Sequence, residues 1–81
     1  MTRTIIMNGI VQTTPIEEEK DCGFFFGNGS NNLPVKVYSP SLVRSVMSYI
    51  RKGIALRIAG KISDLFIIAE HIEIHRNAES F

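Results

Sequence analysis

Cationic and aromatic side chains share a short alternating segment near the middle of the chain. In VKVY (35–38), two valines alternate with Lys36 and Tyr38, so a strand here turns the lysine and the tyrosine to one face. Phe25, in the middle of a run of three phenylalanines, joins this face if its two neighbours belong to the core. Proteins that bind single-stranded nucleic acid combine cations for the phosphates with aromatic rings, and each stacked base contributes about 1–3 kcal/mol. The alternative is that all three phenylalanines pack in a core or at a subunit interface.

A second pair of cations lies on the segment 54–62 (IALRIAGKI), which also alternates. Its large aliphatic residues share one face, and Arg57 and Lys61 project together from the other. As phosphate contacts, these two side chains would extend the basic surface that Lys36 begins. The alternative is a solvated strand face. The candidate nucleic-acid-binding residues are therefore Phe25, Lys36, Tyr38, Arg57 and Lys61.

The remaining reactive side chains do not form a catalytic or metal-binding pattern. His71, Glu73 and His75 could bind a divalent metal, but a strand sets alternate residues about 6.6 Å apart in a line, and no fourth ligand is evident nearby. The acidic run 17–19 is typical of a solvated loop, and the glycines of 27–29 lack the Gly-Lys-Ser/Thr that completes a phosphate loop. We therefore expect no metal, no cofactor and no enzymatic activity.

Cys22 is the only cysteine of the chain, which excludes an intramolecular disulfide and a thiolate metal cluster. The apolar stretch near the N-terminus is too short and too polar for a signal peptide, and no run reaches membrane-spanning length. These features predict a cytoplasmic protein that does not associate with membranes.

Length and composition indicate one small domain. The chain has 81 residues, and we expect a single domain over 1–76 with a frayed tail at 77–81. Residues 1–40 carry three basic and four acidic side chains, whereas residues 41–81 carry six basic and four acidic ones, for a net charge of +1. This balance permits nucleic-acid binding without requiring it. Because 44% of so short a chain is apolar, we expect a partner to cover part of its surface, most simply in a homo-oligomer.

Five segments have the composition and alternation of strands, and glycine and asparagine mark the turns between them. Gly9 interrupts the first of them, where we expect a bulge or a sharp bend. Pro15 and the acidic run after it are expected to form an exposed loop, while Ile72 and Ile74 of the last strand should face inward. The expected strands are 3–14, 22–27, 35–38, 54–62 and 65–75.

One helix separates the third and fourth strands. From Leu42 the apolar residues follow the spacing of an amphipathic helix, and Ser41 is placed to cap its N-terminus. Arg51 and Lys52 fall in the expected last turn, where cations favour the negative end of the helix dipole, and Gly53 ends the helix.

Short strands with tight turns and a single helix in this order favour an all-β, five-stranded barrel closed by the helix, as in the oligonucleotide/oligosaccharide-binding (OB) fold. An open antiparallel sheet with one helix on it is the alternative, since it requires the same local structure.

Two stretches resemble a known family. IIMNGIVQTTP (5–15) resembles the first strand of bacterial single-stranded DNA-binding proteins, and YIRKGIALRIAGKI (49–62) resembles their junction between the helix and the fourth strand. Related OB modules of primosomal proteins and replicative polymerases share much of this pattern. The resemblance implies an OB fold and single-stranded DNA binding. It does not extend to long loops or to an acidic C-terminal tail, so it implies neither the wrapping of long DNA nor recruitment of partners through such a tail.

Two functions therefore remain open. The first is non-enzymatic binding of single-stranded nucleic acid, DNA or RNA, with little sequence specificity. The second is an OB domain that acts as a protein-interaction adaptor or as a subunit of a larger complex. The near-neutral charge favours the second, and the pairing of Lys36 with Tyr38 favours the first.

Overall fold

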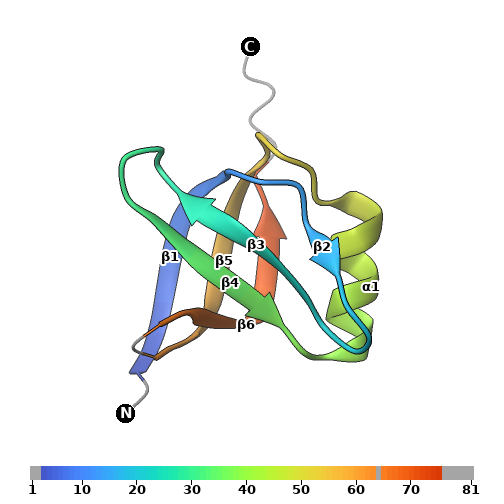
Figure 1. Cartoon of the computed structure of the whole chain (residues 1–81). Coiled ribbons are helices and arrows are strands. Elements are labelled where there is room, and N and C mark those ends of the chain that lie inside the picture. The colour runs from blue at the N-terminus through green and yellow to red at the C-terminus, as the bar shows by residue number, and fades with distance from the viewer. Residues whose placement is uncertain (1–2, 64, 76–81) are drawn as a thin grey trace.

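The computed structural model describes residues 3–63 and 65–75. In these residues the chain forms six strands and one helix, shown in Figure 1. They are β1 (Arg3–Val11), β2 (Ile16–Glu17), β3 (Cys22–Gly27), β4 (Asn32–Val37), α1 (Pro40–Tyr49), β5 (Ala55–Ile62) and β6 (Ile67–Ile74).

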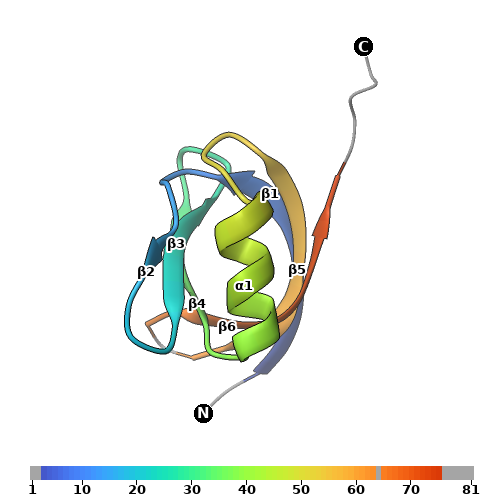
Figure 2. The ribbon, with the colours of Figure 1, turned by 90° about the vertical axis from the view of Figure 1, so that its right-hand side faces the viewer.

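Five of the strands close into a barrel. The hydrogen-bonded order is β1-β5-β6-β4-β3, and β3 returns to β1 at Ile10 and Val11. The β4–β6 pair is parallel and the other pairs are antiparallel. Figure 2 shows α1 lying across the opening between β3 and β5. The predicted five-stranded barrel, with one helix between its third and fourth strands, is confirmed, and the open sheet is excluded.

The barrel is filled by the apolar side of each strand. Phe24 and Phe26 are 4% and 0% exposed, and their rings meet edge to face with centroids 6.3 Å apart. Val35 and Val37 of β4 are equally buried, so the predicted alternation of both strands is confirmed. The other buried hydrophobic residues are Val11, Cys22, Val43, Val46, Ile50, Leu56, Ile58, Ile67 and Ala69.

Gly9 is a point of close approach, and of the bulge or sharp bend predicted there, the bulge is absent. The β1–β5 register runs unbroken through Gly9, but a Cβ at this residue would lie 3.0 Å from the Gly27 carbonyl oxygen and 3.1 Å from the Phe26 ring. A side chain at this residue would therefore be tightly packed against the core ring and a neighbouring backbone, which favours glycine. The irregularity lies instead in the β5–β6 pair, between Ala59 and Gly60, where the register shifts by one residue.

The helix begins and ends earlier than predicted. Ser39, not Ser41, is the N-cap residue, because the fixed φ of Pro40 suits the first helical turn. The helix ends at Tyr49, since Ile50 is extended and turns its side chain into the core. Arg51 therefore lies beyond the last turn, yet its guanidinium still donates to the Met47 and Ile50 carbonyl oxygens, at 3.3 and 3.0 Å. Lys52 and Gly53 follow in the turn to β5, where Gly53 has a φ of +95°.

The segment after β1 is more ordered than predicted. Pro15 is buried, and Ile16 and Glu17 form β2, which pairs with Gly23 and Cys22. The expectation of an exposed loop holds for Glu18 and Glu19. It was wrong for Pro15, which is buried, and it did not include β2, because only the tertiary structure supplies the strand edge of β3.

The remaining boundaries differ by a few residues. The first strand ends at Val11, the third begins at Asn32, and the last covers Ile67–Ile74. Ile72 packs against the core as predicted, and Ile74 lies on the same side, opposite buried Leu56 and beside α1, although it is 43% exposed. The tail predicted at 77–81 lies outside the described residues.

Candidate nucleic-acid interface

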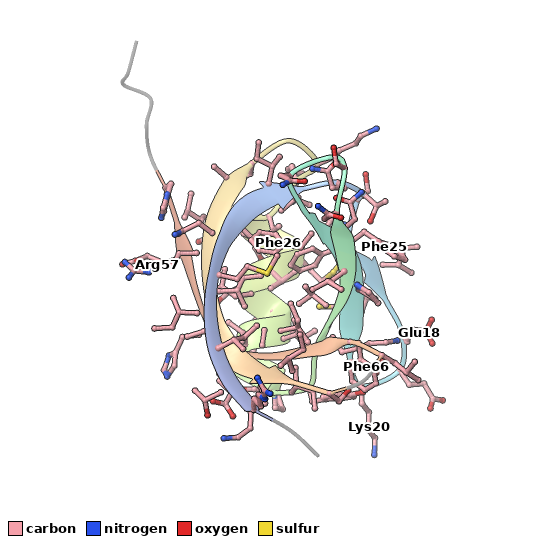
Figure 3. All side chains as sticks on the ribbon, turned by 90° about the vertical axis from the view of Figure 1, so that its left-hand side faces the viewer. Glu18, Lys20, Phe25, Phe26, Arg57 and Phe66 are labelled. Atoms are coloured by element: carbon pink, nitrogen blue, oxygen red, sulfur yellow. The ribbon has the colours of Figure 1, made fainter. Side chains whose placement is uncertain are left out.

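Phe25 is displayed on the outside of β3 by a backbone that is fixed on both sides. Its side chain is 46% exposed, because its two neighbours face the core. The Gln12 N–H donates to the Phe25 carbonyl oxygen at 2.8 Å, and the Phe25 N–H donates to the Thr13 hydroxyl at 2.9 Å. The segment after β1 thus fixes the backbone that carries the ring, and the ring itself remains half exposed. Figure 3 shows Phe25 outside the barrel and Phe26 inside it.

Lys36 lies on the same outer face, one strand away. It pairs across the β3–β4 ladder with Gly23, and Phe25 pairs with Pro34, so the lysine and the phenylalanine occupy diagonal positions. A groove of about 420 Å³ follows this face, between the segment after β1 and the outer side of β4. It is lined by Thr13, Thr14, Ile16, Glu18, Asp21, Cys22, Gly23, Phe24, Phe25, Pro34, Val35 and Lys36.

Two carboxylates also line this groove, and sequence reasoning missed both. Glu18 and Asp21 stand at the turn between β2 and β3, where the Glu18 N–H donates to the Asp21 carbonyl oxygen at 2.8 Å. Figure 3 shows Glu18 on the same side of the barrel as Phe25. The acidic run predicted an ordinary solvated loop, because nothing in the sequence shows that β2 bends this turn towards Lys36. The groove therefore carries one cation, two anions and an aromatic wall.

Tyr38 lies beyond the end of β4 and outside this groove. It is 46% exposed and borders a surface hollow with Glu18, Glu19, Lys20 and Asp21. The prediction that Tyr38 belongs to the strand of Lys36 is wrong, because β4 ends at Val37, and the tyrosine borders the acidic turn rather than the groove that Lys36 lines.

Arg57 and Lys61 project from the outer face of β5, and each has an acidic neighbour. An Arg57 guanidinium nitrogen lies 3.9 Å from a Glu73 carboxylate oxygen, and Lys61 Nζ lies 4.0 Å from Glu70. Lys61 and Lys36 both pair with Ile68 of β6, one from each side. The backbones of the two lysines are therefore about 10 Å apart, which is two strand spacings.

Arg57 lies on the opposite side of the barrel from Phe25, as Figure 3 shows. The structure thus brings Phe25 and Lys36 together, places Tyr38 and Lys61 at the margins of their face, and separates Arg57 from them.

The other reactive groups are isolated or buried. Burial, followed by the nearby Glu17 and Asp21 carboxylates, raises the pKa of Cys22 to about 11, so its thiol is protonated and unreactive at neutral pH. Within the described residues, no three His, Cys, Asp or Glu side chains come together to hold a metal ion. No helix in this part of the chain is long and apolar enough to cross a membrane.

Comparison with known proteins identifies the fold. No family model and no curated protein sequence matches the chain. The mitochondrial single-stranded DNA-binding protein Rim1 of S. cerevisiae superposes with a TM-score of 0.80 at 12% identity, over 91% of this chain and 94% of Rim1. A chain of the S. pombe Stn1–Ten1 complex gives a TM-score of 0.81 at 19% identity, over 96% of this chain and 62% of the other.

A third solved structure, TiaS in complex with a tRNA and ATP, gives a TM-score of 0.75 at 23% identity, over 89% of this chain and 18% of TiaS. At these identities the similarity establishes the OB fold. The sequence resemblance to bacterial single-stranded DNA-binding proteins remains a prediction, because no family model matches.

Proposed function

We propose that the protein binds single-stranded nucleic acid, with DNA as the first candidate, and that it acts by binding rather than by catalysis. The observation that carries this proposal is the fixed, half-exposed Phe25 ring beside Lys36 on the outer face of β3 and β4. A base can stack on the ring while the ammonium group contacts a phosphate, and a duplex cannot offer its base faces in this way.

The structural relatives support this proposal through what their names record. Rim1 is a single-stranded DNA-binding protein of similar length, and TiaS was solved with a tRNA. The same fold in both proteins makes an oligonucleotide a reasonable ligand, but the surface of this chain must supply the contacts.

The charges of the chain set the expected strength of binding. With a net charge of +1 and carboxylates at the edge of the groove, few phosphates can be neutralised, so the affinity should be moderate and should fall with salt. Stacking and phosphate contacts carry little base information, which predicts weak sequence preference over most of the bound strand.

Fluorescence anisotropy with a labelled oligonucleotide of about 12 nucleotides tests the proposal, since OB domains cover about 4–16 nucleotides. We expect saturable binding at low salt, weaker binding at moderate salt, and much weaker binding of the same sequence as a duplex. An RNA strand of that sequence, titrated in parallel, decides between DNA and RNA. Absence of binding at high-micromolar protein and low salt would contradict the proposal.

A second function, association with another protein chain, is favoured by β1. Its residues 3–9 pair with β5 on one side, and within the described residues no strand pairs with their other side. Ile6 and Ile10, on the outer face of this strand, are 62% and 43% exposed. An unpaired strand edge with an apolar face is a surface to which other strands add.

We propose that a second copy of the chain occupies this edge, which would leave the groove beside Phe25 open. Light scattering should then give a dimer mass for the native protein and a monomer mass for Ile6→Lys, because the substitution places a charged side chain from each copy on the apolar contact surface. A monomer mass for the native protein at high concentration would contradict the proposal, whatever its affinity for nucleic acid.

A further inference from the structure

The floor of the groove beside Phe25 is a glycine. A Cβ at Gly23 would lie 3.0 Å from the Val35 carbonyl oxygen and 3.6 Å from Cδ of Lys36. The neighbouring strand β4 therefore borders the space beside Gly23 closely on one side. Because Gly23 has no side chain, the floor between the Phe25 ring and Ile16 is low. Ile16 is 66% exposed and forms the opposite wall, on β2.

The size and walls of the groove suit a flat, apolar ring. Its volume of about 420 Å³ lies within the range of roughly 300–1,000 Å³ that is typical of small-ligand sites. Its lining is largely apolar, with polar groups placed at a few points. A nucleobase that stacks on Phe25 can therefore extend over Gly23 towards Ile16.

The groove contains side chains of both charges, one cation and two carboxylates. Lys36 can contact a phosphate, whereas ionised Glu18 and Asp21 can only accept hydrogen bonds and repel phosphates. A strand that crosses the groove is thus expected to place its backbone near the lysine and to direct hydrogen-bond donors towards the turn between β2 and β3. The edges of the bases are the part of a nucleic acid that carries such donors.

We propose that this groove binds one base that presents an amino group, such as cytosine, and discriminates against thymine and uracil. This inference rests on the proposed function and specifies it. Cytosine offers its N4 amino group to a carboxylate, while thymine presents its O4 oxygen at the same position. Glu18 and Asp21 would accept a hydrogen bond from cytosine, whereas with thymine their carboxylate oxygens would face another acceptor and no hydrogen bond would form.

A basic peptide side chain is the rival occupant, because carboxylates and an aromatic ring also attract a cation. Lys36 in the same groove opposes that occupant and supports a phosphate-bearing one. The largely apolar lining, which includes Phe25 and Ile16, likewise fits a planar base better than a solvated ammonium group.

Competition between two homopolymers tests the proposal. Oligo-dC and oligo-dT of equal length, about 12 nucleotides, compete with a labelled mixed-sequence strand at neutral pH. We expect the native protein to prefer oligo-dC by at least about fivefold, the lower end of what one good base contact provides. The double variant Glu18→Gln/Asp21→Asn should reduce this preference to less than about twofold, mainly by binding oligo-dT more tightly, since side-chain amides can donate to its O4 oxygen.

Glu19→Gln is the matched control. Glu19 belongs to the same acidic run but borders the hollows beside Tyr38 rather than this groove. Its substitution removes an equal charge, so it should strengthen the binding of both oligonucleotides equally and keep their ratio. Thermal unfolding of each variant shows whether the barrel is intact.

The outcomes separate this inference from the proposed function. Equal binding of oligo-dC and oligo-dT by the native protein overturns the base preference and leaves single-strand binding standing. A preference that persists in the double variant overturns the assignment to Glu18 and Asp21. The third outcome is that the protein binds neither oligonucleotide but binds a labelled oligolysine peptide, which unlabelled peptide displaces. This outcome overturns both the base preference and the proposed single-strand binding, and it identifies a basic peptide as the occupant of the groove.

Discussion

Two outer faces of the barrel, that of β3 and β4 and that of β5, show the same alternating sequence pattern but differ chemically. Each is an alternating strand with cations at outward positions. On the first face, Lys36 shares a groove with the Phe25 ring. On the second face, both cations form ion pairs with glutamates of β6. Arg57 lies 3.9 Å from Glu73, and Lys61 lies 4.0 Å from Glu70.

The difference shows that the neighbouring strand decides what an exposed cation can do. Exposed ion pairs contribute only about 0–1 kcal/mol, so Arg57 and Lys61 gain little stability from Glu73 and Glu70. The glutamates nevertheless offset the positive charge that a phosphate would meet. We therefore assign the main ligand contacts to the β3–β4 face and a minor role to the β5 face.

Removing the exposed ring should have the largest effect on binding. Phe25→Ala should weaken single-strand binding by about 5- to 150-fold, because one stacked base contributes about 1–3 kcal/mol. Anisotropy titration measures the loss. Tyr49→Ala, which removes another exposed aromatic ring from α1, is the control and should bind as the native protein does. An equal loss in Arg57→Gln would erase the difference between the two faces.

The inner side of β3 provides a check that this strand is held firmly in the barrel. The pKa of Cys22 is about 11 in the folded protein, against an ordinary value of 9.0. Because the folded state favours the protonated thiol, this group contributes fully to the free energy of unfolding below pH 9. The contribution, roughly 2–3 kcal/mol, is lost as the pH rises through 11. Urea unfolding of the native protein and Cys22→Ala measures it. Parallel pH profiles for the two proteins would show that the thiol is not buried as described.

Charge removal should distinguish the faces through salt dependence. Lys36→Gln should lower the slope of log affinity against log salt by about 0.7, the value for one phosphate contact with a single strand. Arg57→Gln should lower it by less than half as much, because Glu73 already offsets that charge. Titrations at several salt concentrations measure both slopes. A larger change for Arg57 would transfer the main phosphate contacts to β5.

Freeing the paired arginine should have the smallest effect. Glu73→Gln removes the acidic partner of Arg57, and we expect binding to tighten by less than about twofold, since exposed pairs are weak. Glu19→Gln provides an equal change of net charge elsewhere on the surface. If Glu73→Gln tightened binding about tenfold while Glu19→Gln did not, the β5 face would belong to the ligand surface.

Much of the fold could be predicted because the alternation of each strand is local. The alternation of Val35 and Val37 correctly predicted that both side chains fill the barrel. The run of three phenylalanines left open which of them face the core, and the structure buries Phe24 and Phe26. The helix was recognised by its spacing, but its first residue was missed because Ser41 was expected as the N-cap, whereas Pro40 already occupies the first helical turn.

The parts that could not be predicted depend on contacts between distant segments. β2 has only two residues and exists because β3 offers it an edge. The register shift beside Gly60 sets which glutamates face Arg57 and Lys61, and no local signal reveals it. For the same reason the alternation predicted that Lys36 faces outward, but it could not decide the exposure of Phe25 or show that Glu18 and Asp21 share this groove.

Nuclear magnetic resonance titration of the labelled protein with a short single-stranded oligonucleotide tests the central claim most directly, because it observes both faces at once. We predict that the amide shifts change most at Thr13, Gly23, Phe25 and Lys36 and remain small at Arg57. Changes centred on Arg57 and its neighbours on β1 and β5, with Phe25 and Lys36 unaffected, would contradict the account.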